Sequence, residues 1–359
     1  MKIPRPISIL PILAGCLMLA AGSAAAQVSL APPGGPTPPA SQPAAKPKAK
    51  PHAVTRKPAA SAVTAKPAPA ATVIPAPAPD DPNVDLVFGA YQRGQYKTAF
   101  DLATQRVQDK GDAKAMTMLG ELYANAMGVR RDDAKAAEWY RRAADAGDRE
   151  GMFALAMLRL EGRGGPVNRD EAVKLLASSA KLGNPKAAYN LALLYLDGQT
   201  LPQDLKRAAE LLRVAADAGN PEAQYALATF YKEGTGVPKD LEKAVRLLQA
   251  ASLADNVDAE VEYAIALYNG TGTPKNEAAG VALLRKAARQ NSPIAQNRLA
   301  HVLLSGRGAP MDKVEGLKWH LVAKGVGKGD PMLDEAFSDL SPADRAKAEA
   351  AARKWLGGK

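Results

Sequence analysis

The chain has 359 residues, of which 47% are hydrophobic, mainly Ala and Leu, whereas aromatic residues make up only 5%. This length and composition allow a sizeable core of closely packed helices. The formal net charge is +10, but residues 83–359 carry only +4 of it, so no nucleic-acid-binding surface is expected.

Residues 1–26 have the pattern of a signal peptide. Lys2 and Arg5 precede an apolar run from Ile7 to Ala21, and residues 24–26 are small, as at a cleavage site. The run is shorter than the ~20 residues that a membrane-spanning helix needs. We therefore expect a periplasmic or secreted protein.

A second kind of export is compatible with the same leader. Residues 13–16 resemble the processing box of bacterial lipoproteins, in which Cys16 would be lipidated and would anchor the protein to a membrane. The apolar run, however, continues past Cys16. Cys16 is also the only cysteine, so cleavage after Ala26 would leave no thiol nucleophile and no disulfide.

Residues 27–82 are predicted to be a disordered linker. Pro, Ala, Lys and Thr dominate the segment, and its net charge is +4. Such a composition buries too little apolar surface to offset the entropy of ordering. The linker is interpreted as a spacer, or as a basic segment that contacts an anionic envelope surface.

Residues 112–327 contain six copies of a 36-residue period without gaps. Leu119, Leu155, Leu191, Leu227 and Leu299 recur at one position, and Gly or Ala follows each of them. Such columns of large and small residues are typical of stacked repeats. Residues 83–111 read as a degenerate N-terminal capping repeat, and residues 328–359 as C-terminal capping helices.

Each copy is predicted to form two helices. In the fourth copy, Asn220 caps the first helix and Pro221 suits its first position, while Gly234 to Pro238 break it and Asp240 caps the second. The counterparts of Asp240 are all able to cap a helix: Asp132, Asn168, Asp204, Asn276 and Asp312. Glycines at the end of the second helices are expected to adopt left-handed backbone angles.

The first copy carries the fullest form of a known pattern. It combines Ala115, Leu119-Gly120 and Tyr123, a glycine in the loop, and then Trp139-Tyr140 and Ala143-Ala144. This pattern resembles the Sel-one-like repeat, a relative of the tetratricopeptide repeat. The resemblance implies an all-α fold, a right-handed α-solenoid of stacked antiparallel helix pairs. It also implies a role in protein interaction or assembly rather than catalysis.

The resemblance further implies that the first helices line a concave groove. Apolar residues gather at the groove positions of the middle copies, and the predicted partner-binding residues are Phe153, Met157, Leu160, Tyr189, Leu193, Leu196, Tyr225, Ile265 and Tyr268. An exposed apolar strip of this length is expected to hold a protein or peptide segment. The alternative is that these side chains pack between helices.

Catalytic, metal and cofactor sites are not indicated. The Gly-rich loops recur in every copy with no preceding strand, so a structural turn is favoured over a phosphate cradle. His52, His301 and His320 have no metal-ligand spacing, and His320 is expected to pack. The main hypothesis is a non-enzymatic envelope scaffold or adaptor, possible roles being in envelope signalling or assembly. The alternative is a protein or enzyme that binds muropeptides or β-lactams.

Overall fold

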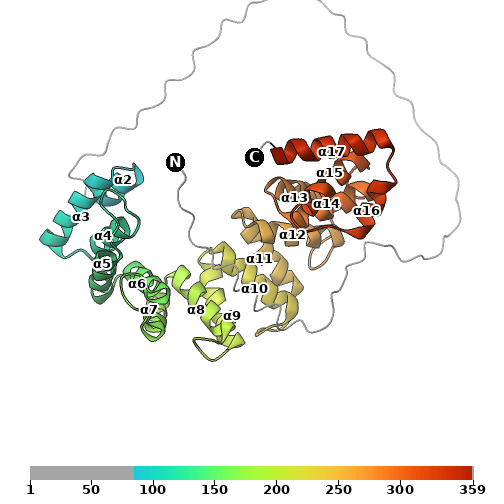
Figure 1. Cartoon of the computed structure of the whole chain (residues 1–359). Coiled ribbons are helices and arrows are strands. Elements are labelled where there is room, and N and C mark those ends of the chain that lie inside the picture. The colour runs from blue at the N-terminus through green and yellow to red at the C-terminus, as the bar shows by residue number, and fades with distance from the viewer. Residues whose placement is uncertain (1–84, 358–359) are drawn as a thin grey trace, which may run out of the picture. The chain divides into compact units, whose positions relative to one another are not determined.

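The structure is a computed structural model that describes residues 85–357. The predicted signal peptide, Cys16 and the linker lie outside these residues. All regular secondary structure in the described part is helical, in sixteen helices named α2–α17 (Figure 1). None of these helices combines the length and apolar character that crossing a bilayer requires.

Helices α4–α15 form six pairs, one for each repeat. The first helices of the pairs are α4 (Ala113–Ala124), α6 (Arg149–Glu161), α8 (Pro185–Asp197), α10 (Pro221–Glu233), α12 (Val257–Asn269) and α14 (Pro293–Ser305). The second helices are α5 (Asp133–Asp145), α7 (Arg169–Lys181), α9 (Leu205–Asp217), α11 (Leu241–Leu253), α13 (Glu277–Arg289) and α15 (Lys313–Lys324). Before them come α2 (Leu86–Gln92) and α3 (Tyr96–Lys110), and after them α16 (Pro331–Ser338) and α17 (Pro342–Gly357).

The helix boundaries follow from local capping. All six predicted second-helix caps accept hydrogen bonds from the first turn, as Asp240 does from the Lys243 amide at 2.9 Å. Asn184, Asn220 and Ser292 cap first helices that begin with proline. Each such bond satisfies an amide that the helix itself leaves without an acceptor. The predicted caps are therefore confirmed.

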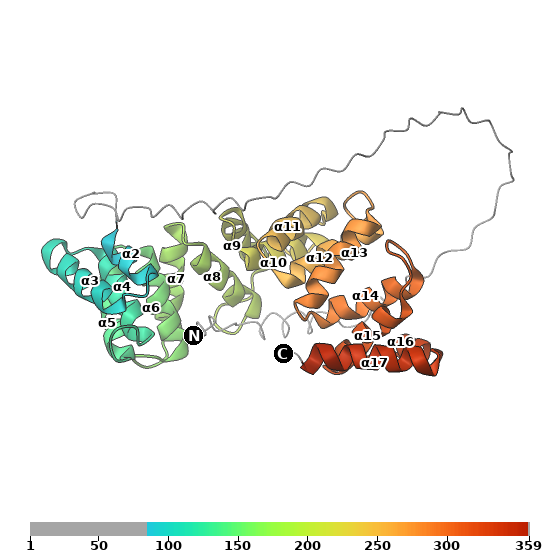
Figure 2. The ribbon, with the colours of Figure 1, turned by 90° about the horizontal axis from the view of Figure 1, so that it is seen from above.

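The pairs stack in chain order. Each first helix packs on the second helix of its own repeat, which packs in turn on the first helix of the next repeat. Both views show the helices following one another from α2 to α17 (Figures 1 and 2). The expected α-solenoid of stacked helix pairs is confirmed.

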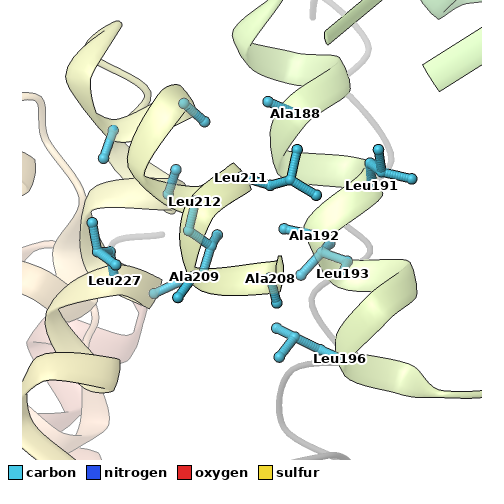
Figure 3. Close-up of a cluster of buried hydrophobic side chains, with 14 of the residues drawn as sticks. Ala188, Leu191, Ala192, Leu193, Leu196, Ala208, Ala209, Leu211, Leu212 and Leu227 are labelled. Atoms are coloured by element: carbon cyan, nitrogen blue, oxygen red, sulfur yellow. The ribbon is translucent and has the colours of Figure 1, made fainter. Parts of the chain in front are cut away.

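Small side chains bring the helices close together. In the middle of the array, Ala188 and Ala192 of α8 belong to the same buried cluster as Ala208 and Leu212 of α9 (Figure 3). All four side chains are fully buried. The leucines around them fill the remaining gaps, so that the core continues from one repeat to the next.

The last helix covers the end of the array. α17 packs on α15, where the rings of Trp319 and Trp355 meet edge to face with centroids 5.1 Å apart. Lys318 Nζ lies 4.2 Å from the centroid of the Trp319 ring. This aromatic contact buries Trp319 to 3% exposure, although no seventh repeat follows.

Candidate partner-binding face

The structure divides the nine predicted partner-binding residues into two groups. Leu193, Leu196 and Tyr268 are only 6%, 9% and 4% exposed. Leu193 and Leu196 point among the packed side chains between α8 and α9 (Figure 3). These three therefore contribute mainly to packing of the array.

The other six residues are half-buried. They lie on four successive first helices, α6, α8, α10 and α12, and are called here the first-helix strip: Phe153, Met157, Leu160, Tyr189, Tyr225 and Ile265. Phe153, Leu160 and Tyr189 pack against the central core, and Tyr225 packs against a neighbouring cluster. These four side chains thus have one side fixed by packing and another open to solvent, which suits preorganised contact.

Acidic residues accompany the two tyrosines of the strip. Burial raises the pKa of Tyr189 to about 12, and the charge of Glu222 adds to the shift. Burial also raises the pKa of Tyr225 to about 12, with further contributions from Glu262 and Asp258. The phenol groups therefore stay neutral, and they lie in a field that favours cations.

Most of these carboxylates are not neutralised by the fold. Glu262 is paired with Lys232 at 3.0 Å, across α10 and α12. Glu222 and Asp258 are exposed and form no ion pair among residues 85–357. Surrounding protein atoms raise the pKa of Asp258 by displacing water, and the charge of Glu262 raises it further. Aromatic and apolar surface beside such carboxylates suits Lys or Arg side chains with apolar neighbours.

At the same positions of the outer repeats, polar side chains form hydrogen bonds within the fold. Thr117 donates to Asp148 at 2.6 Å, and Tyr140 donates through its hydroxyl to Glu121 at 3.0 Å. Near the other end, His301 Nε2 lies 2.8 Å from an oxygen of Asp330. The first-helix strip is therefore confined to the middle of the array.

The remaining candidates fall into structural roles. His320 is fully buried, as expected for a packing residue, and its Nε2 lies 2.8 Å from an oxygen of Asp334. Gly162, Gly234 and Gly306 end first helices with left-handed backbone angles. Among the described residues, no cluster of His, Cys, Asp and Glu is suited to hold a metal ion.

Comparison with protein families identifies the repeats. The model of the Sel1 repeat matches residues 113–148, 149–184, 185–220, 221–256, 257–292 and 293–323. These segments are contiguous and cover more than half of the chain. The chain belongs to the Sel1 repeat family. Sel1 repeat proteins generally mediate protein–protein interactions.

Two solved structures resemble this Sel1 repeat protein. A Sel1 repeat protein from Oxalobacter formigenes is 24% identical with a TM-score of 0.58, over 67% of this chain and 98% of that one. A protective antigen present in uropathogenic Escherichia coli strains, displaying an SLR fold, is 25% identical with a TM-score of 0.52, over 75% of this chain and 67% of that one. Comparison with curated proteins gave no match.

The acidic residues beside the first-helix strip were not predicted from the sequence. Glu222 and Asp258 lie 36 residues apart, at the same place in the first turn of α10 and α12. Their spacing was visible in the sequence, but it reads as ordinary surface charge until the tyrosines beside them are placed. The signal that would have found them is the combination of this acidic column with Tyr189 and Tyr225.

Proposed function

We propose that this Sel1 repeat protein is a non-enzymatic scaffold or adaptor of the cell envelope that binds a protein or peptide on the first-helix strip. The observation that carries the proposal is the row of half-buried apolar side chains across α6, α8, α10 and α12. The partner segment presents apolar side chains together with Lys or Arg, which face the carboxylates of Glu222 and Asp258.

Tyr189 and Tyr225 are the proposed anchors of binding. Tyrosines offer a large contact area and lose little conformational entropy, and alanine substitution of an anchor typically costs 2 kcal/mol or more, about 30-fold in affinity. Both side chains are held on one side by the core. The strip is thus rigid before a partner arrives, which lowers the entropic cost of binding.

Crosslinking in the envelope tests this proposal. The full chain, the double variant Tyr189→Ala/Tyr225→Ala and the control Tyr195→Ala are compared, because Tyr195 is a half-buried tyrosine on α8 outside the strip. A partner identified by mass spectrometry and then purified should bind the wild-type protein and the control but not the double variant. Equal binding to all three proteins, with comparable melting curves, would show that the first-helix strip does not bind the partner.

The envelope location rests on the leader pattern of residues 1–26. A reporter that is active only outside the cytoplasm, fused after Lys359, should be active with the leader and inactive when residues 2–26 are deleted. Labelling with a fatty acid, compared between the wild-type protein and Cys16→Ala, distinguishes soluble export from lipidation. Within this proposal, the basic segment 27–82 contacts anionic envelope surfaces, and its binding to anionic vesicles should weaken with salt.

A further inference from the structure

A carboxylate fills the gap between the second helices α5 and α7. Glu171 accepts a hydrogen bond from the Arg141 guanidinium on one oxygen, and one from Arg159 Nε at 3.0 Å on the other. Burial acts to raise the pKa of Glu171, but the two arginines outweigh it and hold that pKa below its usual range. The fold therefore contains an internal example of a carboxylate held at this position.

The same positions two periods later carry a different set of residues. Arg213 of α9 replaces Arg141, Tyr231 of α10 replaces Arg159, and Lys243 of α11 replaces Glu171, each 72 residues further along the chain. Between them lies a pocket of about 250 Å³ that is open to solvent, called here the cavity, whose lining also includes Leu227, Arg246 and Leu247. No side-chain carboxylate bridges Arg213 and Tyr231 within residues 85–357.

The cavity lining is strongly basic. Three cations, Arg213, Lys243 and Arg246, stand against one acidic lining residue, Asp217. Lys243 Nζ lies 3.0 Å from the helix-capping carboxylate of Asp240, and the Lys243 side chain is about half exposed. Arg246 lies 3.8 Å from Glu242, and both of these side chains are largely exposed. Exposed pairs of this kind are weak and leave cationic character at the cavity.

Arg213 is already oriented toward this cavity. Its Nη2 donates to the Tyr231 hydroxyl at 3.3 Å, and it forms no ion pair among the described residues. The Tyr231 side chain is fixed, because the residue is only 9% exposed. An entering carboxylate would find a guanidinium and a hydroxyl as donors, and Lys243 as a nearby charge.

We propose that this cavity, formed by α9, α10 and α11, binds a carboxylate group from outside the fold. The group accepts hydrogen bonds from Arg213 and from the Tyr231 hydroxyl, in the place that Glu171 occupies two repeats earlier. The cavity does not include any residue of the first-helix strip, so this inference does not depend on the proposed function. The carboxylate belongs to an acidic protein segment or to a free small carboxylate.

Ligand-detected NMR with the full chain tests the cavity and its ligand. The probes are the blocked tripeptide acetyl-Ala-Glu-Ala-amide, its glutamine analogue and citrate. The glutamate peptide, citrate or both should bind, and the glutamine peptide should not. Binding of the glutamate peptide alone assigns an acidic segment, and binding of citrate alone assigns a free carboxylate. Binding of neither, or equal binding of the two peptides, would overturn the proposal.

Substitutions then locate the binding. Arg213→Gln should lower the affinity for the bound probe about tenfold, because a hydrogen bond to a charged group is lost. Lys243→Glu should abolish binding, because its own carboxylate would occupy the place of Glu171. Arg285→Gln is the matched control, since Arg285 has the position of Arg213 two periods later and lies outside the cavity. Affinity unchanged in Arg213→Gln, or lost equally in Arg285→Gln, would contradict the assignment.

Discussion

At the scale of single residues, the glycines of the repeat loops show how the pairs approach one another. Gly236 has a backbone φ of 66°, in the left-handed region that favours glycine. A Cβ at this position would overlap the carbonyl oxygen of Leu205, at the start of the preceding second helix. The Gly-rich loop is thus a point of close contact between repeats, which explains its recurrence without any phosphate.

Gly236→Ala is expected to lower the free energy of unfolding by about 3 kcal/mol, because it combines left-handed strain with the steric overlap. Gly219→Ala is the matched control: its φ is 85°, but no heavy atom lies within 4 Å of an added Cβ. The control should lose only about 1 kcal/mol. Chemical denaturation of both variants measures the difference, and equal losses would show that the contact with Leu205 relaxes freely.

A buried carboxylate in the fifth repeat breaks the local pattern. Gln224 and Gln296 each donate to a backbone carbonyl of the preceding helix, Ala216 at 3.2 Å and Ala288 at 3.1 Å. Glu260 has the same position, is fully buried, and lies with Oε2 2.8 Å from Lys286 Nζ. An ionised carboxylate cannot donate to the carbonyl, so its burial depends on Lys286.

Lys286→Met should therefore cost about 3 kcal/mol of stability, because it leaves Glu260 buried without its cation. In the background of Glu260→Gln the same substitution should cost less than about 1 kcal/mol, since the amide can donate as in the neighbouring repeats. A double-mutant cycle by chemical denaturation measures this coupling. Additive effects of the two substitutions would show that the pair does not stabilise the fold.

At the scale of helices, most boundaries could be predicted because capping is local. Asn220, Pro221 and Asp240 act within one turn of their own positions, so the residue types alone indicate where helices begin. The exposure of the strip could not be predicted in the same way. Tyr225 stays half-buried while Tyr268 is 4% exposed. The difference depends on how closely neighbouring helices pack around each ring, which the residue types alone do not determine.

Helix α16 is held by charged contacts to the last repeat. Asp334 receives a hydrogen bond from Lys324 and lies 2.8 Å from His320 Nε2, and these contacts hold the pKa of Asp334 below its usual range. A carboxyl with a lowered folded-state pKa stabilises the fold above its unfolded value of about 3.9, and that stability is lost as the pH falls through the folded pKa.

Asp334→Asn should consequently have a lower melting temperature than the wild-type protein at pH 7. Its melting temperature should also fall less than that of the wild-type protein between about pH 5 and pH 2. Asp339→Asn, at the end of the same helix, serves as the control, because Asp339 forms no ion pair within residues 85–357. Thermal melts across this pH range provide the measurement. A pH profile of Asp334→Asn parallel to that of the wild-type protein would exclude this carboxylate as a source of acid sensitivity.

At the scale of the whole molecule, charge is sorted between the two sets of helices. Residues 83–359 carry a net charge of only +4, yet acidic residues line the strip on α10 and α12 while Arg213, Lys243 and Arg246 line the cavity beside α9 and α11. A repeat array can do this because each position of the period recurs on the same side of every pair. One chain therefore presents two surfaces that favour ligands of opposite charge.

The carboxylates beside the first-helix strip, such as Glu222 and Asp258, should make partner binding by the strip dependent on salt. The triple variant Glu222→Gln/Asp258→Asn/Glu233→Gln removes three of these charges, including Glu233 at the end of α10, whose charge also acts on Tyr225. It should bind the crosslinked partner about fivefold more weakly at low salt, since exposed charges contribute less than about 1 kcal/mol each. The difference from the wild-type protein should shrink as ionic strength rises, because the Debye length falls from about 10 Å at 0.1 M toward 3 Å at 1 M. Glu242→Gln on α11 is the control, as this exposed carboxylate lies outside the strip. Calorimetric titration of the partner at several salt concentrations measures both effects, and an affinity that is independent of salt would leave apolar contact alone as the basis of binding.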